Sequence, residues 1–273
     1  MPELPEVESI ATRLRQGTHE QPSLLGQPIV AGQVLWELAV ASPAPTEFLA
    51  RIRSQVIQQI GRRGKFLVFR LSPDTLLFHL RMSGDLLIEG RSAPLAAHHR
   101  LTLDLGDGRR LAFNDPRKFG RAWLVGDPQE ILGELGPEPL DPALTAEEFG
   151  RRLSAHRRQL KPLLMDQRFL AGLGNIYADE ALHHAHLHPL TQASRLSASQ
   201  GERLLQGIRQ VLQEGIRRNG ASIDWAYRGG EFQNYFRVYG RAGEPCLECG
   251  APIQRIVVGQ RGTHFCPACQ PGP

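Results

Sequence analysis

The first six residues, Met1-Pro2-Glu3-Leu4-Pro5-Glu6, are the ones best suited to covalent chemistry. A small residue at the second position lets Met1 be removed, which would leave Pro2 as a free secondary amine. An α-amino group has a pKa of about 8, against about 10.4 for lysine, so much more of it is neutral near pH 7. A neutral amine can attack a carbon electrophile to form a Schiff base, and carboxylates such as Glu3 and Glu6 could then move protons. The alternative interpretation is an acidic terminal arm stiffened by its prolines.

All four cysteines lie in one C-terminal segment, in which sixteen residues separate Cys246-x2-Cys249 from Cys266-x2-Cys269. Paired C-x2-C units at this separation predict a structural zinc ion held by four thiolates at the tips of a β-hairpin. Residues 253–258 and 263–265 would form the strands and residues 259–262 the turn. Arg261 in that turn could reach a phosphate. Two disulfides are the main alternative, which a reducing cytoplasm disfavours.

Two further groups stand at the ends of predicted strands. Lys65 ends the segment Gly61-Arg62-Arg63-Gly64-Lys65, just before an apolar strand, and is one of only three lysines beside Lys118 and Lys161. His79 and Met82 lie where another strand enters a glycine turn, which would expose both side chains. The ordinary interpretations are a solvated lysine and a core methionine.

The segment Asn114-Asp115-Pro116-Arg117-Lys118-Phe119-Gly120 is a polar, basic loop with one aromatic ring near its tip. An apolar ring and an arginine side by side suit a wedge that fills the space of an extruded base. Taken alone, the same residues also fit an ordinary β-turn.

Residues 172–175, Gly-Leu-Gly-Asn, fall between two predicted helices. They lack the third glycine and the preceding strand of a dinucleotide fingerprint. A tight turn whose backbone N–H groups face a phosphate fits them better. Four nearby histidines scatter around a helix end, which disfavours metal ligation: His183, His184, His186 and His188.

The elements that must position these groups begin with a helix over residues 7–16, where apolar side chains recur at helical spacing. From about residue 29 to 125 the chain reads mostly as short strands between turn signals, with one helix expected over 46–58. This pattern is typical of an antiparallel sandwich or barrel. The clearest strands are residues 66–69, 76–78, 86–88 and 101–105.

The second part of the chain follows a Pro/Gly-rich connector, residues 135–142. Helices are expected over 145–156, 161–166, 176–185 and 199–218, the first with a capping box of Thr145 and Glu148. We therefore expect two domains, residues 1–134 and 143–273, joined by the linker 135–142. The zinc finger would occupy residues 240–273.

Composition and charge point to an intracellular protein with a polyanionic partner. The apolar share of 41% and the charged share of 22% are ordinary for a globular protein. No apolar run approaches the roughly 20 residues that span a bilayer, and the N-terminus is acidic where a secretory signal would be basic. We therefore expect a cytoplasmic, nucleoid-associated protein with no membrane partner.

The positive charge is concentrated in the second half of the chain. Residues 1–150 hold 16 Lys+Arg and 19 Asp+Glu, a balance of −3, and residues 151–273 hold the remaining 16 and 9, a balance of +7. Such a basic half favours binding of nucleic acid.

Together these motifs resemble one family over essentially the whole chain: the bacterial formamidopyrimidine-DNA glycosylases (the Fpg/Nei base-excision repair enzymes). The resemblance rests on five ordered segments: residues 2–8, 62–65, 79–84, 114–120, and 170–178 together with the four cysteines. It implies an α+β fold of an N-terminal β-sandwich with flanking helices and a C-terminal helical domain. That second domain would contain a helix–two-turn–helix motif and a β-hairpin C4 zinc finger, with DNA in the cleft between the domains.

The resemblance also implies an activity: excision of 8-oxoguanine and formamidopyrimidines from duplex DNA, followed by β,δ-elimination. Pro2 would be the nucleophile at the sugar, Glu3 the carboxylate that shuttles protons there, and Glu6 the one that shapes the site. Groups that match those gripping backbone phosphates are Lys65, His79, Asn175 and Arg261, with Lys65 and Arg261 also assigned to the catalytic set. Residues that would fill the gap left by the lesion are Met82, Arg117 and Phe119.

Arg117 would face the orphaned base, normally cytosine, and a monomer with one structural zinc ion is expected. Residues 222–236 align with the loop that caps the lesion. Arg81 departs from the family pattern, which usually has a small residue there. Two alternatives remain: a Nei-type enzyme for oxidised pyrimidines, and a zinc-finger protein that binds damaged DNA without catalysis.

Overall fold

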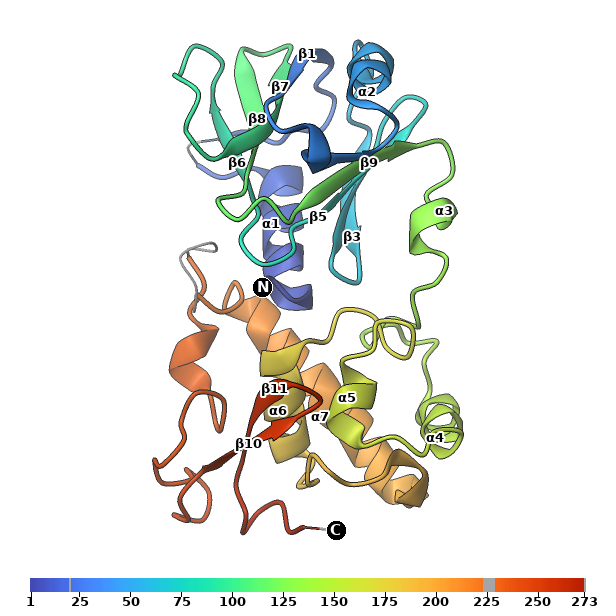
Figure 1. Cartoon of the computed structure of the whole chain (residues 1–273), viewed down its shortest axis with the longest axis vertical. Helices are drawn as coiled ribbons and strands as arrows, with labels where there is room; N and C mark the ends of the chain where they lie inside the picture. The colour runs from blue at the N-terminus through green and yellow to red at the C-terminus, as the bar shows by residue number, and fades with distance from the viewer. Residues whose placement is uncertain (20, 223–228, 273) are drawn as a thin grey trace. The chain divides into compact units, whose positions relative to one another are not determined.

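The structure, a computed structural model, describes residues 1–19, 21–222 and 229–272. The chain divides into two compact units, which are labelled in Figure 1 by their helices and strands. Unit 1 comprises Met1–Gly133 with Ala221–Gly230, and unit 2 comprises Glu134–Gly220 with Glu231–Pro273.

Unit 1 is built on two sheets (Figure 1). Four antiparallel strands lie in the order β1-β7-β8-β6, and five lie in the order β2-β9-β5-β4-β3, with β2 parallel to β9. The first sheet consists of β1 (Ile29–Val34), β7 (His99–Leu105), β8 (Arg109–Asn114) and β6 (Asp85–Gly90). The second consists of β2 (Val40–Ser42), β9 (Arg121–Val125), β5 (Thr75–His79), β4 (Phe66–Arg70) and β3 (Gln59–Arg63).

The two sheets and the first helix share one apolar core, as expected for a β-sandwich. Phe78 on β5 meets Phe113 on β8 edge-to-face with ring centroids 5.3 Å apart, so side chains from opposite sheets interdigitate. Helix α1 (Leu4–Gln16) packs against β3 and β4 with an apolar stripe of helical spacing: Leu4, Val7, Ile10 and Leu14. These contacts fix the position of the N-terminus on the sheet.

The expected helix over 46–58 is wrong at its C-terminal end. Helix α2 (Pro45–Ile52) stops six residues earlier, because Ser54 adopts a left-handed backbone (φ 68°) and its N–H donates to the carbonyl of Ile29 on β1. The expected helix over 7–16 and the four expected strands are confirmed, each within three residues of its expected ends. Two short helices complete this part, η1 (Glu37–Ala39) and α3 (Gln129–Leu132).

Unit 2 is helical. Its helices are α4 (Ala146–Ser154), α5 (Leu160–Leu164), α6 (Asn175–His184), η2 (Ala193–Arg195), α7 (Ala198–Arg217) and η3 (Phe232–Tyr235), and a two-stranded hairpin follows them. The long α7 packs against α4 and α6. Gly207 permits the α6 contact, since a Cβ there would lie 3.1 Å from the Ala181 carbonyl oxygen. The four expected helices are therefore present, within two residues of their expected ends.

Half of the expected capping box at Thr145 forms. The Thr145 side chain accepts the N–H of Glu148, but the Glu148 carboxylate pairs with Arg151 instead of returning to the cap. Ser197 and Gln200 form a complete capping box at the start of α7, which the sequence analysis did not identify.

The zinc-finger hairpin consists of β10 (Gln254–Val258) and β11 (Arg261–Phe265). The expected four-residue turn over 259–262 is wrong. The turn is the two-residue Gly259-Gln260, with φ 54° and 63°, so Arg261 is the first residue of β11 and pairs with Val258. Two successive left-handed residues match the twist of a tight hairpin.

Among the described residues, no helix is long and apolar enough to span a bilayer.

Candidate catalytic site and nucleic-acid interface

The N-terminus of unit 1 is held by a reciprocal capping box. Glu3 is the N-cap of α1, and its backbone N–H donates to Glu6 Oε2 at 2.7 Å, while its own side chain accepts the N–H of Glu6. Glu6 Oε1 accepts the N–H of Ala221 at 2.7 Å. Both carboxylates are buried (3% and 2% exposed) at the N-terminal end of the helix. Pro2 is buried beside them, whereas Met1 is 41% exposed, so removal of Met1 takes no side chain from the core.

The two oxygens of Glu6 are thus both engaged with backbone N–H groups. Through these two bonds the carboxylate orients the chain around Pro2. Glu3 is the better placed of the two for proton transfer, since it is adjacent to Pro2.

Lys65 and His79 lie close together at one end of the five-stranded sheet, Lys65 in a turn and His79 on a strand. Lys65 occupies the tight turn between β3 and β4, and Phe66 beside it pairs with His79 at the end of β5. Lys65 is buried (5% exposed), which is unusual for a lysine. Burial, together with the nearby charges of Arg81 and Lys65, lowers the pKa of His79 to about 3.

His79 is therefore neutral at physiological pH. Its Nδ1 accepts the backbone N–H of Arg81 at 3.0 Å, which places the ring proton on Nε2. A neutral imidazole held in this tautomer offers one directed N–H donor, which suits a phosphate oxygen. Arg81 itself has a left-handed backbone (φ 54°), which is uncommon for residues other than glycine.

The three wedge candidates lie on two adjoining loops of unit 1. Met82 is 39% exposed and Phe119 is 49% exposed, both high values for large apolar side chains. The Arg117 guanidinium lies over the Phe119 ring, 5.5 Å from its centroid. An exposed, apolar and cationic group of this kind is suited to stacking against bases.

In unit 2 two side-chain donors meet one backbone carbonyl near the tip of the zinc-finger hairpin. Asn175, the first residue of α6, donates from Nδ2 to the Gly262 carbonyl at 3.2 Å, and Lys161 Nζ donates to the same oxygen at 3.1 Å. Asn175 Oδ1 is buried with no hydrogen-bond partner among the described residues. The exposed Arg261 follows the turn and precedes Gly262, so these contacts hold its backbone in place.

Sequence reasoning missed the residues that organise this tip. Lys161 is fully buried and its ammonium lies 2.5 Å from Asp179 Oδ1, while Asp179 Oδ2 accepts the N–H of His264 on β11 at 2.9 Å. The rarity of lysine in this chain was the available signal for Lys161. Asp179 gave no signal, because its partners are distant in sequence.

The four cysteines meet the geometric requirement for a tetrahedral zinc ion. Their Sγ atoms lie within 4.8 Å of one another, with 3.9 Å between Cys246 and Cys269 and 3.4 Å between Cys249 and Cys266. Zn–S bonds of about 2.3 Å place sulfur atoms about 3.8 Å apart in a tetrahedron. All four are free thiols, so the set fits one structural zinc ion.

Of the four nearby histidines, His183 comes close to the cysteine cluster. Its Nε2 lies 3.7 Å from Cys246 Sγ. Four thiolates already complete a tetrahedral set, so we assign His183 no ligand role.

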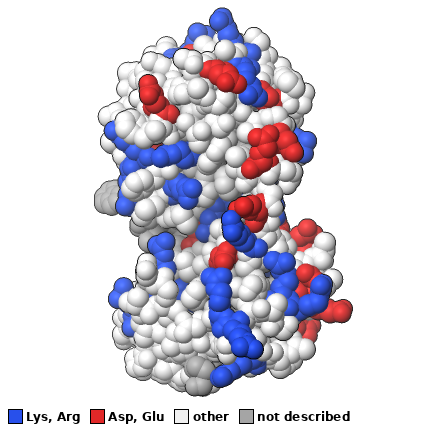
Figure 2. All heavy atoms as spheres, turned by 45° about the vertical axis from the view of Figure 1, so that its right-hand side comes forward, with Lys and Arg blue, Asp and Glu red and all other residues white. Residues whose placement is uncertain are grey.

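The surface also carries the charge expected of a polyanion-binding protein. Figure 2 shows Lys and Arg side chains lying next to one another in several places on the visible face, with fewer Asp and Glu among them. Positive charge of this kind attracts the phosphate backbone.

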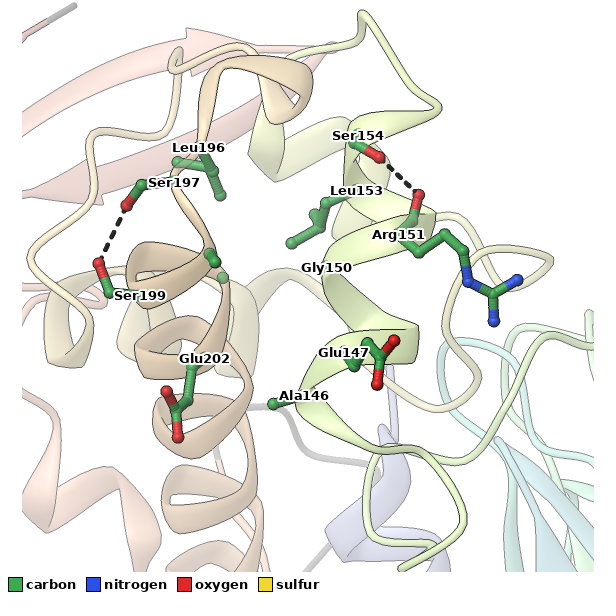
Figure 3. A pocket seen from close by; sticks show the side chains of 12 residues that line it. Ala146, Glu147, Gly150, Arg151, Leu153, Ser154, Leu196, Ser197, Ser199 and Glu202 are labelled. Carbon is green, nitrogen blue, oxygen red and sulfur yellow. Dashed lines mark hydrogen bonds between the residues drawn. The ribbon is translucent and has the colours of Figure 1, made fainter.

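A pocket of about 560 Å³ in unit 2 contains none of these residues. Figure 3 shows it between α4 and the start of α7, with Leu153 and Leu196 near its wall and the carboxylates of Glu147 and Glu202 at its rim. The Ser197 and Ser199 hydroxyls bond to each other, 3.1 Å apart. It lacks a convergent set of reactive groups.

Comparison with known proteins gives a consistent match along the chain. Residues 1–122 match the family described as "Formamidopyrimidine-DNA glycosylase N-terminal domain" and residues 135–226 match "Formamidopyrimidine-DNA glycosylase H2TH domain". Residues 243–272 match "Zinc finger found in FPG and IleRS".

Among similar proteins, the formamidopyrimidine-DNA glycosylase of Chloroflexus aurantiacus is 46% identical over 99% of this chain and 98% of its own length. That of Herpetosiphon aurantiacus is 43% identical over 99% of this chain and all of its own length. The fold is similar to a mutant Lactococcus lactis Fpg solved with Fapy-dG DNA (TM-score 0.91) and to Lactococcus lactis Fpg solved with abasic-site DNA (TM-score 0.90). Each is 35% identical, and each match covers 99% of this chain and 100% of the other.

Proposed function

Because this chain belongs to the formamidopyrimidine-DNA glycosylase family, it is a DNA glycosylase and AP lyase of base-excision repair, and we propose that Pro2 carries its chemistry. Its substrates are oxidised purines in DNA, as the names of its relatives and their DNA complexes indicate. The observation that best supports Pro2 is the placement of Glu3 and Glu6 in a buried capping box directly after it.

The proposed first step is attack of the Pro2 nitrogen on C1′ of the damaged nucleotide. The N–C1′ bond forms as the glycosidic bond breaks; Glu3 takes the proton that the Pro2 nitrogen loses, and the departing base takes up a proton from solvent. The sugar ring then opens between C1′ and O4′, and O4′ receives a proton for which Glu3 is the proposed donor. The product is a cationic Schiff base (iminium) on Pro2.

The iminium then promotes strand cleavage. It acidifies the C2′ hydrogen, whose loss expels the 3′ phosphate by β-elimination, and subsequent loss of the C4′ hydrogen expels the 5′ phosphate by δ-elimination. Glu6, with both oxygens engaged by backbone N–H groups, is proposed to keep the N-terminus in place during these steps.

The target nucleotide must leave the duplex before Pro2 can reach it, which costs a few kcal/mol. We propose that Lys65 and His79 in unit 1, and Asn175 and Arg261 in unit 2, offset this cost by binding backbone phosphates. His79 would bind as a neutral donor through Nε2. Part of the proposed lesion-capping loop, residues 223–228, lies outside the described residues.

The vacated space is proposed to be filled by Met82, Arg117 and Phe119, with Arg117 facing the orphaned base. We propose cytosine as the usual opposite base, a monomer as the active form and the bacterial nucleoid as the place of action. The zinc finger belongs to this function as the support for Arg261.

Strand-cleavage products on defined duplexes test the proposal. On an 8-oxoguanine·cytosine duplex the account predicts ends that carry phosphate on both sides of a one-nucleotide gap, from β- and δ-elimination. Faster cleavage of an oxidised-pyrimidine duplex would instead support the Nei-type alternative, which the names of the relatives do not favour. Binding without any cleavage would support the non-catalytic alternative.

A further inference from the structure

Asp115 is buried beneath the two loops that carry the proposed wedge residues, with 1% of its surface exposed. Its Oδ1 accepts the N–H of Arg117 at 3.2 Å, and its Oδ2 accepts the N–H of Gly120 at 2.7 Å. A single carboxylate therefore bonds both sides of the segment that presents Arg117 and Phe119.

The same carboxylate also reaches the other loop through Ser83. The Ser83 hydroxyl donates to Asp115 Oδ1 and accepts the N–H of Arg117 at 3.2 Å. Ser83 directly follows Met82 in the chain, so the Met82 turn and the Arg117 loop are linked through one buried hydroxyl. The linked groups lie 32 residues apart in sequence, just beyond the paired end of β6 and β8, where Asp85 lies opposite Asn114.

The backbone of Asp115 is itself fixed to unit 1. Its carbonyl accepts Arg100 Nε at 2.8 Å, and its N–H donates to the carbonyl of His98 at 2.9 Å. Gly120 cannot carry a side chain, because a Cβ there would lie 2.3 Å from Phe113 Cζ in the core. The Asp115 carboxylate is therefore a fixed hydrogen-bond acceptor for this loop, and the loop packs at Gly120 against the buried Phe113 ring.

Lys118 provides a second constraint on the loop between Arg117 and Phe119. It has a left-handed backbone (φ 61°), and its ammonium lies over the Trp36 ring, 4.4 Å from the centroid. This contact holds the centre of the loop against Trp36, while Lys118 and its two neighbours all remain exposed.

We infer that Asp115 and Ser83 are positioning residues that hold the Met82 turn and the Arg117–Phe119 loop as one preorganised wedge. They act on base extrusion and on reading of the opposite base, and not on the chemistry at Pro2. A wedge that is already ordered does not lose loop entropy when it enters the DNA. This inference rests on the proposed roles of Met82, Arg117 and Phe119.

The variant Asp115→Asn tests the inference at nearly constant volume. It replaces one carboxylate oxygen by an NH2 group, which then faces an N–H or O–H donor in either orientation of the amide. Ser83→Ala is the milder second variant, because it removes the link between the loops but leaves the carboxylate with its two backbone donors.

Asp74→Asn is a matched control. Asp74 is also a buried carboxylate (8% exposed), and it accepts Arg51 Nη2 and Gln55 Nε2 at 2.8 Å each. It directly precedes Thr75, at the end of β5 opposite to His79, so its network is independent of the wedge loops.

Full-length, zinc-loaded proteins are compared on three DNAs: duplexes with 8-oxoguanine opposite cytosine or adenine, and a single strand with an abasic site. We expect Asp115→Asn to slow single-turnover excision from the cytosine duplex by about tenfold or more, which is about 1.4 kcal/mol of barrier. The cytosine-to-adenine rate ratio should fall, and Ser83→Ala should follow in the same direction by a smaller factor.

The abasic single strand has no damaged base to extrude and no opposite base to recognise. Its rate of borohydride trapping should therefore change by less than about twofold in either variant, well under the roughly 1.4 kcal/mol of a tenfold effect. Asp74→Asn should leave the excision rate on the cytosine duplex, the cytosine-to-adenine rate ratio and the trapping rate on the single strand near those of the unmodified protein. An unchanged cytosine-to-adenine ratio, or equal losses on the single strand and the duplex, would overturn the inference. Failure of the unmodified protein to trap any DNA would instead overturn the proposed function.

Discussion

Lys161 Nζ lies 2.5 Å from Asp179 Oδ1, and neither side chain is exposed to solvent. The pair connects α5 to α6, and through the Gly262 carbonyl and the His264 N–H it also holds β11 of the zinc-finger hairpin. A buried ion pair that fixes three elements places Arg261 at the tip without needing contacts from Arg261 itself.

Removing one partner of this pair should destabilise unit 2 strongly. Lys161→Met leaves the Asp179 carboxylate buried without its cation, and the expected loss is about 3–5 kcal/mol. Urea unfolding of the zinc-loaded protein measures it. The double variant Lys161→Met/Asp179→Leu should recover part of the loss, because no unpaired charge remains. Equal losses in the single and double variants would contradict this account of the pair.

Glu6 should matter for the rate of covalent chemistry more than for DNA binding. Glu6→Gln keeps the shape, but it turns an amide NH2 toward the N–H of Glu3 or of Ala221 and so disturbs the N-terminus. We expect trapping on abasic DNA to slow by about tenfold or more, a barrier change of about 1.4 kcal/mol. Duplex affinity should stay within about twofold, which is well under 1 kcal/mol. A loss of affinity with an unchanged trapping rate would show that Glu6 acts in binding.

His79 should make stability depend on pH. Its folded pKa, lowered by burial to about 3, lies below the ordinary value of 6.5, so the unfolded chain binds the proton more readily. The free energy of unfolding is therefore unaffected by His79 protonation above pH 6.5, and it decreases as the pH falls from 6.5 toward 3. At pH 5 the loss is about 2 kcal/mol.

Urea unfolding at pH 7.5 and pH 5 compares the unmodified protein with His79→Gln. The variant should lose less stability on acidification by about 2 kcal/mol. The comparison between variants is needed because Asp85, whose pKa burial raises to about 6, changes stability in the opposite direction over the same range. Parallel losses in both proteins would show that His79 is not kept neutral by the fold.

The expectations from sequence succeeded where the signal was local. Helix α1 and the strands follow from apolar periodicity, and the zinc site follows from the spacing of its cysteines. The end of α2 could not be predicted, because it depends on the bond from Ser54 to Ile29 on another strand. Asp115 lay within a recognised motif, but its partner Ser83 is 32 residues away. Lys161 is likewise 101 residues from the carbonyl that it supports.

One zinc ion should be released per chain on denaturation, measured with a colorimetric chelator. Removal of zinc from the folded protein should weaken duplex binding, because the ion no longer links the cysteines on either side of the hairpin that carries Arg261. For comparison, Arg261→Ala in the zinc-loaded protein should reduce the salt dependence of binding by about one phosphate contact. A zinc-free protein with unchanged duplex affinity would contradict the supporting role of the finger.

The most direct test of the central claim is to locate the covalent bond. The protein is incubated with abasic-site duplex DNA, reduced with borohydride and digested, and the DNA-linked peptide is sequenced by mass spectrometry. The account predicts a stable adduct on the nitrogen of Pro2 in chains that have lost Met1, and none after Pro2 is acetylated. An adduct on Lys65 or another lysine, or trapping that survives the acetylation, would contradict it.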